Sequence, residues 1–201
     1  CVSPLAAAGP DLGRILKGIE NRYNRVQTLE VLFEQSYKGQ GRAKKESGEA
    51  FLRKPGRMRW AYSSPQGKLF VTDGKYAWLY TPGSNQVEKT PIKQTDDLRA
   101  PLAFLLGKLE FQRDFKRFIW RPEGADYWVV AEPKSDQLAY REVEFLVTPE
   151  FQIRRLRVTG QDRSVMEFRF DRERLNPPLS EKLFQFDPPP GAVVIERRAE
   201  D

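Results

Sequence analysis

Most of the chain alternates apolar and polar residues with a period of two, the pattern of β-strands that are buried on one face. The pattern is clearest over residues 49–65, where Pro55-Gly56 separates two alternating runs. Proline presets φ and glycine takes a positive φ at low cost, so the pair predicts a tight turn between two strands. One face of this hairpin is apolar with one basic group near the turn, and it consists of Ala50, Leu52, Lys54, Met58, Trp60 and Tyr62. The other face is largely charged, so the apolar face must be covered; an ordinary core is the simplest cover.

The same alternation predicts the remaining strands. It occurs in residues 28–38, 68–72, 76–80, 86–91, 115–120, 127–131, 142–147, 153–158, 166–171 and 193–195. Turn residues such as Asp73-Gly74 separate the runs. Gln35 is the polar exception on the apolar face of the first run, which also holds Phe33. Residues 39–48 are polar and basic, and we expect a turn region there.

Two segments follow helical spacing instead. Asp11 can cap a helix whose apolar stripe is formed by Leu12, Ile15, Leu16, Ile19 and Tyr23. Pro101 opens a second short helix that runs to about Leu106, since proline is tolerated in the first turn. Leu102, Leu105 and Leu106 lie on one side of this helix, which is too short to be stable alone and must rest on an apolar surface.

These elements predict an α+β, mostly β fold of ten or eleven antiparallel strands and two helices. A sheet of that many twisted strands curls, and two short helices cannot cover it as a full layer. We therefore expect a single domain over residues 9–201, in which a strongly curved antiparallel sheet forms an unclosed β-barrel with a short α-helical lid.

Residues 1–8 are expected to lie outside this domain, as a signal-peptide remnant or a disordered N-terminus. The small residues Ala6 and Ala8 favour the end of a secretory signal. The competing interpretation is a lipoprotein whose acylated first residue is Cys1. Either interpretation places the chain outside the cytoplasm.

The composition argues against catalysis. The 201 residues include no histidine and one cysteine, Cys1, which excludes Ser-His-Asp and Cys-His catalysis and thiolate metal clusters. Neither a glycine-rich phosphate loop nor a G-x-S-x-G motif occurs. We expect no catalytic residues, no metal, no cofactor and no enzymatic activity.

The net charge of +6 would permit an acidic partner. The basic residues are interspersed with Glu and Asp along the strands instead of being massed in a tail, so they indicate a solvated sheet face and no nucleic-acid partner. No apolar run approaches the ~18 residues of a membrane helix.

Five motifs in register resemble the outer-membrane lipoprotein carrier family, LolA. They are Phe33-x-Gln35; Leu52-x-Lys54-Pro55 leading into Trp60-x-Tyr62-x-x-Pro65; Asp73-Gly74-Lys75-x-x-Trp78-x-Tyr80-x-Pro82; Pro101-Leu102; and Phe184-x-Phe186-x-Pro188-Pro189-x-Gly191. Their order and spacing hold from about residue 11 to residue 195. One departure is Lys54, where the family commonly has an arginine that binds the lid backbone. The expected partners of Lys54 are carbonyls at the end of the helix over residues 101–106. Lysine lacks the planar fork of arginine, so this contact is expected to be weaker.

The resemblance implies a monomeric periplasmic carrier of acylated lipoproteins. Such a carrier receives its cargo from an inner-membrane lipoprotein-releasing ABC transporter and delivers it to an outer-membrane lipoprotein acceptor. Lys54 would gate the lid, and the lipid-binding residues would be Phe33, Leu52, Met58, Trp60, Tyr62, Leu102, Leu105 and Leu106. For each of these residues, plain core packing is the alternative. The alternative function is a lipoprotein- or lipid-sensing module of the same half-barrel fold.

Overall fold

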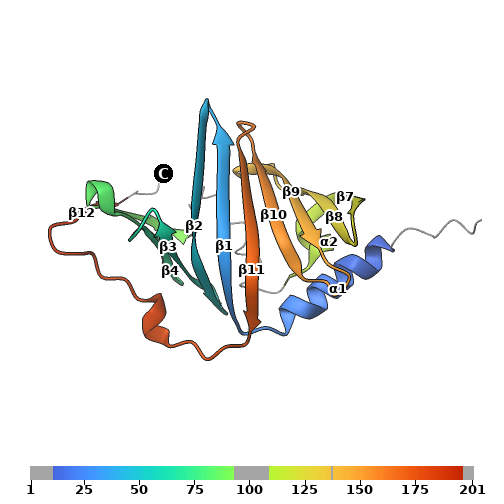
Figure 1. Cartoon of the computed structure of the whole chain (residues 1–201), viewed down its shortest axis with the longest axis horizontal. Helices are drawn as coiled ribbons and strands as arrows, with labels where there is room; N and C mark the ends of the chain where they lie inside the picture. The colour runs from blue at the N-terminus through green and yellow to red at the C-terminus, as the bar shows by residue number, and fades with distance from the viewer. Residues whose placement is uncertain (1–10, 93–108, 137, 197–201) are drawn as a thin grey trace, which may run out of the picture.

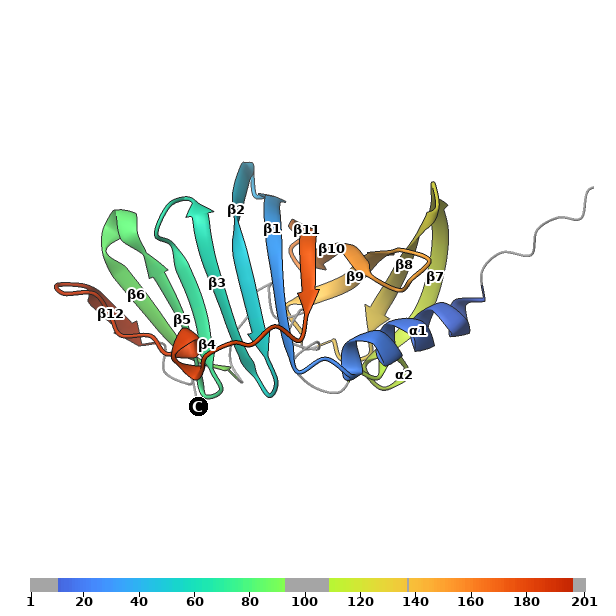
Figure 2. The same ribbon diagram turned by 60° about the horizontal axis from the view of Figure 1, so that its bottom comes forward.

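A single sheet of twelve strands, bent into an open half-barrel, makes up most of the described chain (Figures 1 and 2). The computed structural model describes residues 11–92, 109–136 and 138–196. The strand order is β12-β6-β5-β4-β3-β2-β1-β11-β10-β9-β8-β7. Neighbours are antiparallel except for β12, which pairs with β6 in parallel. The unclosed, mostly β architecture predicted from the alternation is confirmed, with one or two more strands than expected.

The bounds of the elements follow the predicted runs closely. The strands are β1 (Thr28–Gly39), β2 (Arg42–Arg53), β3 (Arg57–Ser64), β4 (Leu69–Asp73), β5 (Tyr76–Thr81), β6 (Gln86–Pro91), β7 (Phe115–Glu123), β8 (Asp126–Pro133), β9 (Tyr140–Val147), β10 (Ile153–Gly160), β11 (Val165–Leu175) and β12 (Val193–Glu196). The described helices are α1 (Leu12–Asn24), α2 (Phe111–Asp114) and the 3₁₀ turns η1 (Pro82–Ser84) and η4 (Glu181–Phe184). The predicted helix at residues 101–106 lies outside the described residues.

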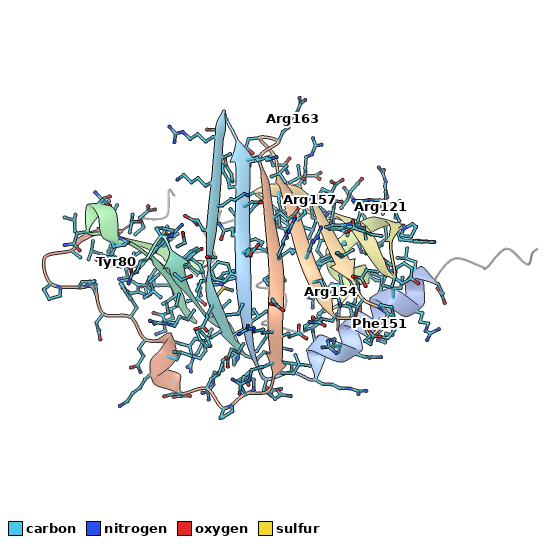
Figure 3. The ribbon with its side chains drawn as sticks, viewed as in Figure 1. Tyr80, Arg121, Phe151, Arg154, Arg157 and Arg163 are labelled. Atoms are coloured by element: carbon cyan, nitrogen blue, oxygen red, sulfur yellow. The ribbon has the colours of Figure 1, made fainter. Side chains whose placement is uncertain are left out.

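Helix α1 begins where its sequence indicates. The Asp11 carboxylate accepts a hydrogen bond from the backbone N–H of Gly13 at 2.9 Å, which caps the first turn. The predicted stripe faces the sheet, and Ile15, Leu16, Ile19 and Tyr23 are buried. Gly18, which weakens the helix, makes room for a neighbour: a Cβ there would overlap the ring of Phe151, the residue beside α1 in Figure 3.

The prediction of a turn region over residues 39–48 is wrong. The turn consists of Gln40 and Gly41, both with positive φ (49° and 71°), as a two-residue hairpin loop requires. Strand β2 starts directly afterwards, and its pairing with β1 runs without a break from Gly39–Arg42 to Thr28–Arg53. The tip of this long hairpin extends beyond the core, so its residues lack the apolar alternation that reveals a strand.

The core lies on the inner face of the curved sheet. We call it the interior: a continuous cluster of buried apolar side chains from the sheet and α1. Its members include Leu29, Val31, Phe33, Ala50, Leu52, Met58, Trp60, Tyr62, Phe145, Leu156, Phe168 and, from α1, Ile15, Leu16, Ile19 and Tyr23. Both halves of the sheet contribute to it, so the strand curvature and α1 together enclose one core.

The outer face is solvated over one half of the sheet and covered over the other. On β10, Arg157 pairs with Glu144 at 3.0 Å and Glu167 at 2.9 Å, as expected for a charged outer face (Figure 3). Over β3 to β6, the segment between β11 and β12 crosses the sheet (Figures 1 and 2). The guanidinium of Arg59 donates to the carbonyl of Leu183 at 3.2 Å in this segment. Phe186 packs against Trp78 with ring centroids 5.8 Å apart.

Candidate functional site: the apolar interior

Five of the predicted lipid-binding residues meet in the interior. Phe33, Leu52, Met58, Trp60 and Tyr62 are all buried, and Trp60 is 0% exposed. The ring of Phe33 lies 4.6 Å from that of Trp60 and 5.1 Å from that of Tyr62, both edge-on. The Trp60 Nε1–H points at the sulfur of Met58, 3.1 Å away. The predicted residues Leu102, Leu105 and Leu106 lie outside the described residues.

Strand register explains why these large side chains fit together. On β2, small residues stand opposite large ones: Ala50 pairs with Trp60, and Gly48 pairs with Phe33 of β1. A Cβ at Gly48 would overlap the carbonyl oxygen of Ala61, so only glycine lets β2 and β3 approach this closely. The aromatic rings therefore fill the space that the small residues leave.

Among the described residues, the side chains around Trp60 leave little open space. A residual cavity of about 20 Å³ remains beside Trp60, and Tyr23 and Glu173 also line it. On this measure a water molecule needs ~10–15 Å³, so the cavity has room for about one water molecule and far too little for an acyl chain. An acyl chain can therefore enter only if side chains or α1 move.

One end of the interior, which we call the α1 end, is closed by hydrogen bonds to Tyr23. The Nζ of Lys54 donates to the carbonyl oxygen of Tyr23 at 2.8 Å, in the last turn of α1. Such carbonyls carry partial negative charge, which favours a cation. Burial lowers the pKa of Lys54. The structure thus places Lys54 at a helix C-terminus, but at that of α1; the predicted contact with residues 101–106 lies outside the described residues.

The side chain of Tyr23 forms a second set of bonds at the α1 end. Its hydroxyl donates to Glu173 at 2.8 Å and accepts from the backbone N–H of Ile153 at 2.9 Å. Arg22 donates to the other oxygen of Glu173 at 2.6 Å. Burial and the Glu173 carboxylate raise the pKa of Tyr23. Helix α1 is thereby tied to β10, β11 and the β2–β3 turn at one point.

Sequence reasoning missed Glu173 as an inward-facing residue. The register between β1 and β11 shifts between Glu30 and Leu32, and Arg172 has a positive φ of 52°. This bulge puts an extra residue into β11 and turns the Glu173 side chain toward Tyr23. Strict alternation from Phe168 and Phe170 would place Glu173 on the outer face. A non-glycine residue with positive φ has no strong signature in a single sequence.

The other end, the hairpin-tip end, is polar. The Tyr62 hydroxyl donates to Gln35 at 3.2 Å, which explains the polar residue on the apolar face of β1. Lys68 donates to both oxygens of Glu46 at 2.7 and 2.8 Å and lies 4.5 Å from the Tyr62 ring centroid. The side chains of Glu46 and Lys68 are only 12% and 17% exposed.

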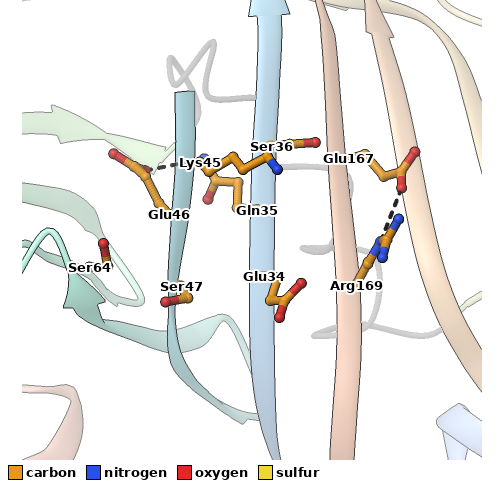
Figure 4. Close-up of a pocket in the computed structure, with 9 residues that line it drawn as sticks. All are labelled: Glu34, Gln35, Ser36, Lys45, Glu46, Ser47, Ser64, Glu167 and Arg169. Atoms are coloured by element: carbon orange, nitrogen blue, oxygen red, sulfur yellow. Dashed lines mark hydrogen bonds and ion pairs between the residues drawn. The ribbon is translucent and has the colours of Figure 1, made fainter. Parts of the chain in front are cut away.

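Larger hollows occur on the outer side of the sheet, over β1, β2 and β11. Figure 4 shows one of about 420 Å³, lined by charged and hydroxyl residues such as Glu34, Lys45 and Arg169. A second, of about 650 Å³, shares Glu34, Ser47 and Arg169 with it and also reaches Phe33 and Tyr62. Charged side chains line both hollows, whereas the interior is lined by buried apolar side chains, so the candidate lipid site remains the interior.

Within the described residues, no group of three or more His, Cys, Asp or Glu side chains could hold a metal ion. No helix in that part of the chain has the length and apolarity needed to cross a membrane.

The chain matches known proteins over most of its length. The model of a family described as "Outer membrane lipoprotein carrier protein LolA" matches residues 24–187. An outer-membrane lipoprotein carrier protein of Nitrosomonas europaea is 28% identical over 97% of this chain and 93% of its own. The protein of the same name from Methylibium petroleiphilum is 32% identical, over 94% of this chain and 91% of its own.

The fold is also found among solved structures. An uncharacterised conserved protein of Thermus thermophilus superposes with a TM-score of 0.52 at 15% identity, over 92% of this chain and 98% of that protein. At this identity the likeness concerns the fold alone.

Proposed function

Because this chain belongs to the outer membrane lipoprotein carrier protein LolA family, we propose that it is a periplasmic carrier that holds the acyl chains of lipoproteins in its interior. It receives them from an inner-membrane lipoprotein-releasing ABC transporter and delivers them to an outer-membrane lipoprotein acceptor. The observation that carries the proposal is the interior itself: five predicted lining residues form one apolar cluster, closed at one end by hydrogen bonds to a single helix.

The energetics of acyl transfer explain why such closure is useful. Burying a methylene group is worth ~0.8 kcal/mol, so a sixteen-carbon chain resists entry into water by roughly 12 kcal/mol. A carrier has to offset this cost and still release its cargo without nucleotide. An interior that fills itself when empty does both, because closure competes with binding and lowers the apparent affinity.

Closure through hydrogen bonds sets the strength of this competition. An intramolecular hydrogen bond contributes ~0.5–1.5 kcal/mol net. The bonds from Lys54, Ile153 and Glu173 to Tyr23 therefore hold α1 with a few kcal/mol, on the order of a tenth to a third of the acyl transfer energy. The cargo can break such a closure, and the closure can help to expel the cargo.

Tryptophan quenching tests the location of the acyl chain. Trp60 lies in the interior, whereas Trp128 packs between the guanidinium groups of Arg121 and Arg157. A lipopeptide with brominated acyl chains should quench wild-type fluorescence, because bromine quenches only at contact. Trp60→Phe should remove most of this quenching, and the control Trp128→Phe should retain it. Quenching that persists in Trp60→Phe would place the acyl chain elsewhere, and absence of lipopeptide binding would refute the carrier function.

A further inference from the structure

The inner face of the β1–β2 hairpin changes from apolar to charged along its length. Next to Trp60, Val31 pairs with Ala50 and Phe33 with Gly48. Toward the tip, the inward pairs become Gln35 with Glu46, Tyr37 with Lys44 and Gly39 with Arg42. The register runs without interruption, so these pairs share one face with the lining of the interior. The face therefore has the polarity of an amphiphile, with its apolar end at α1.

A pocket of about 290 Å³ lies at the charged end of this face. Residues that line it include Tyr37, Gln40, Arg42, Lys44, Glu46 and Lys68. Gln35 also lines it and accepts the hydrogen bond from Tyr62, so the pocket adjoins the interior directly. Its volume suits a small polar group at the end of a chain that occupies the interior.

The side chains that line the pocket carry a net positive charge. Glu46 is the carboxylate among its lining residues, and Lys68 holds both of its oxygens at 2.7 and 2.8 Å. Arg42 and Lys44 have no ion-pair partner within the described part of the chain, and both are exposed. The positive charges of Arg42 and Lys44 are therefore not compensated by a lining carboxylate. The outer face of the same hairpin also carries two exposed lysines, Lys38 and Lys45.

We propose that this pocket binds the anionic head group of an amphiphilic lipid, with a phosphate near Arg42 and Lys44 and the acyl chain in the interior. Arginine and lysine are the side chains that bind phosphate oxygens most strongly. If the acyl chain lies in the interior between Tyr23 and Gln35, a phosphate that is a few bonds from the end of the acyl chain would lie in the pocket. The inference rests on the proposed function, because it requires acyl binding in the interior, and it extends the ligands from lipoproteins to anionic phospholipids.

Isothermal titration with two lipids of equal chain length tests the site. Lauroyl lysophosphatidylglycerol is anionic and lauroyl lysophosphatidylcholine is net neutral, and both are used below their micelle concentrations. Wild-type protein should bind the anionic lipid about three- to tenfold more tightly, as two partly exposed ion pairs would produce. Raising the salt concentration from about 20 mM to about 300 mM should remove most of the preference, because the Debye length shortens severalfold.

The hairpin supplies a matched pair of variants. Arg42→Glu combined with Lys44→Glu changes the inner face, and Lys38→Glu combined with Lys45→Glu makes the same change of charge on the outer face. The inner variant should abolish or reverse the lipid preference while binding lysophosphatidylcholine as wild type does. The outer variant should keep the preference. Equal loss in both variants would mean that only the overall charge matters and would overturn the site.

Three further outcomes separate this inference from the proposed function. If both lipids bind equally and neither variant changes this, the interior binds acyl chains but the pocket is no anion site. If acylated peptides with an acidic residue beside the acyl group lose affinity in the inner variant and the lysophospholipids do not, the pocket reads a protein segment, and the lipid assignment is wrong. If no lipid or lipopeptide binds at all, the proposed function itself fails.

Discussion

The two ends of the interior are closed by different chemistry. At the α1 end, Lys54, Glu173 and the backbone of Ile153 converge on Tyr23, a single residue of a single helix. At the hairpin-tip end, the bonds among Gln35, Glu46, Tyr62 and Lys68 connect residues within β1 to β3 and the adjoining turn. Opening the α1 end detaches a helix from the sheet, whereas the hydrogen bonds at the hairpin-tip end can stay intact. From this difference we propose that α1 controls access to the interior, in line with the proposed head-group site at the hairpin tip.

The largest effect is expected from Glu173→Ala. Removing the carboxylate leaves the buried Tyr23 hydroxyl and the partly buried Arg22 without their partner. Removing one partner of a buried ion pair costs ~3–5 kcal/mol. Because Arg22 is 27% exposed, we expect a smaller decrease in the free energy of unfolding, about 2–4 kcal/mol. Urea denaturation measures it.

Glu181→Ala is the control for this variant. Glu181 pairs with Arg53 and Arg57, but its side chain is 66% exposed. An exposed pair contributes ~0–1 kcal/mol, so the control should change stability by less than about 1 kcal/mol. Similar losses in both variants would show that Glu173 is an ordinary surface partner and that the α1 end has no special closure.

A smaller effect separates the two ends directly, because a tyrosine hydroxyl forms hydrogen bonds at each of them. Tyr23→Phe removes the bonds to Glu173 and Ile153, and Tyr62→Phe removes the bond to Gln35. Each should cost about 1–2 kcal/mol of stability. Only Tyr23→Phe should loosen α1, so only this variant should bind a fluorescent fatty acid more tightly, about three- to tenfold. Equal affinities in the two variants would contradict a gating role for α1.

The pH dependence of stability provides an independent check on Tyr23. Its pKa in the folded state is raised above the unfolded value of ~10 by burial and by Glu173. The neutral phenol is therefore favoured by folding, and this contribution is fully present below pH ~10 and is lost as the pH rises further. The wild type should lose stability more steeply than Tyr23→Phe above pH ~10, as urea titrations at several pH values would show. Parallel profiles would mean that Tyr23 ionises freely in the folded protein.

The sequence predicts those parts of the fold in which apolar and polar residues alternate. Period-two runs identify the strands, and the face shared by Met58, Trp60 and Tyr62 identifies the interior. The tip of the β1–β2 hairpin was missed because it has no buried face to impose a pattern. Glu173 was missed because the bulge at Arg172 reverses the alternation, and nothing in the neighbouring side chains signals the bulge.

The partner of Lys54 illustrates a different limit. The position of Lys54 at the turn end of the apolar face follows from the hairpin, and a cation there favours a helix C-terminus. Two helices were predicted, and local sequence does not say which helix end comes within reach of the turn. In the structure the Lys54 Nζ donates to the carbonyl of Tyr23 at 2.8 Å, at the end of α1, and Asn24 holds that end by exchanging hydrogen bonds with the backbone of Leu109.

The smallest effect concerns Lys54, whose side chain donates one hydrogen bond to the carbonyl of Tyr23. Lys54→Leu removes this bond and the favourable charge at the helix end, which together are worth about 1 kcal/mol at a half-exposed site. We expect the variant to bind a fluorescent fatty acid about two- to fivefold more tightly than wild type and to release it more slowly to acceptor vesicles. Lys54→Arg can donate to more than one carbonyl, so it should bind the same probe more weakly. If all three proteins bind and release the probe alike, Lys54 does not gate the interior, and the other contacts of α1, such as that between Tyr23 and Glu173, hold the helix in place.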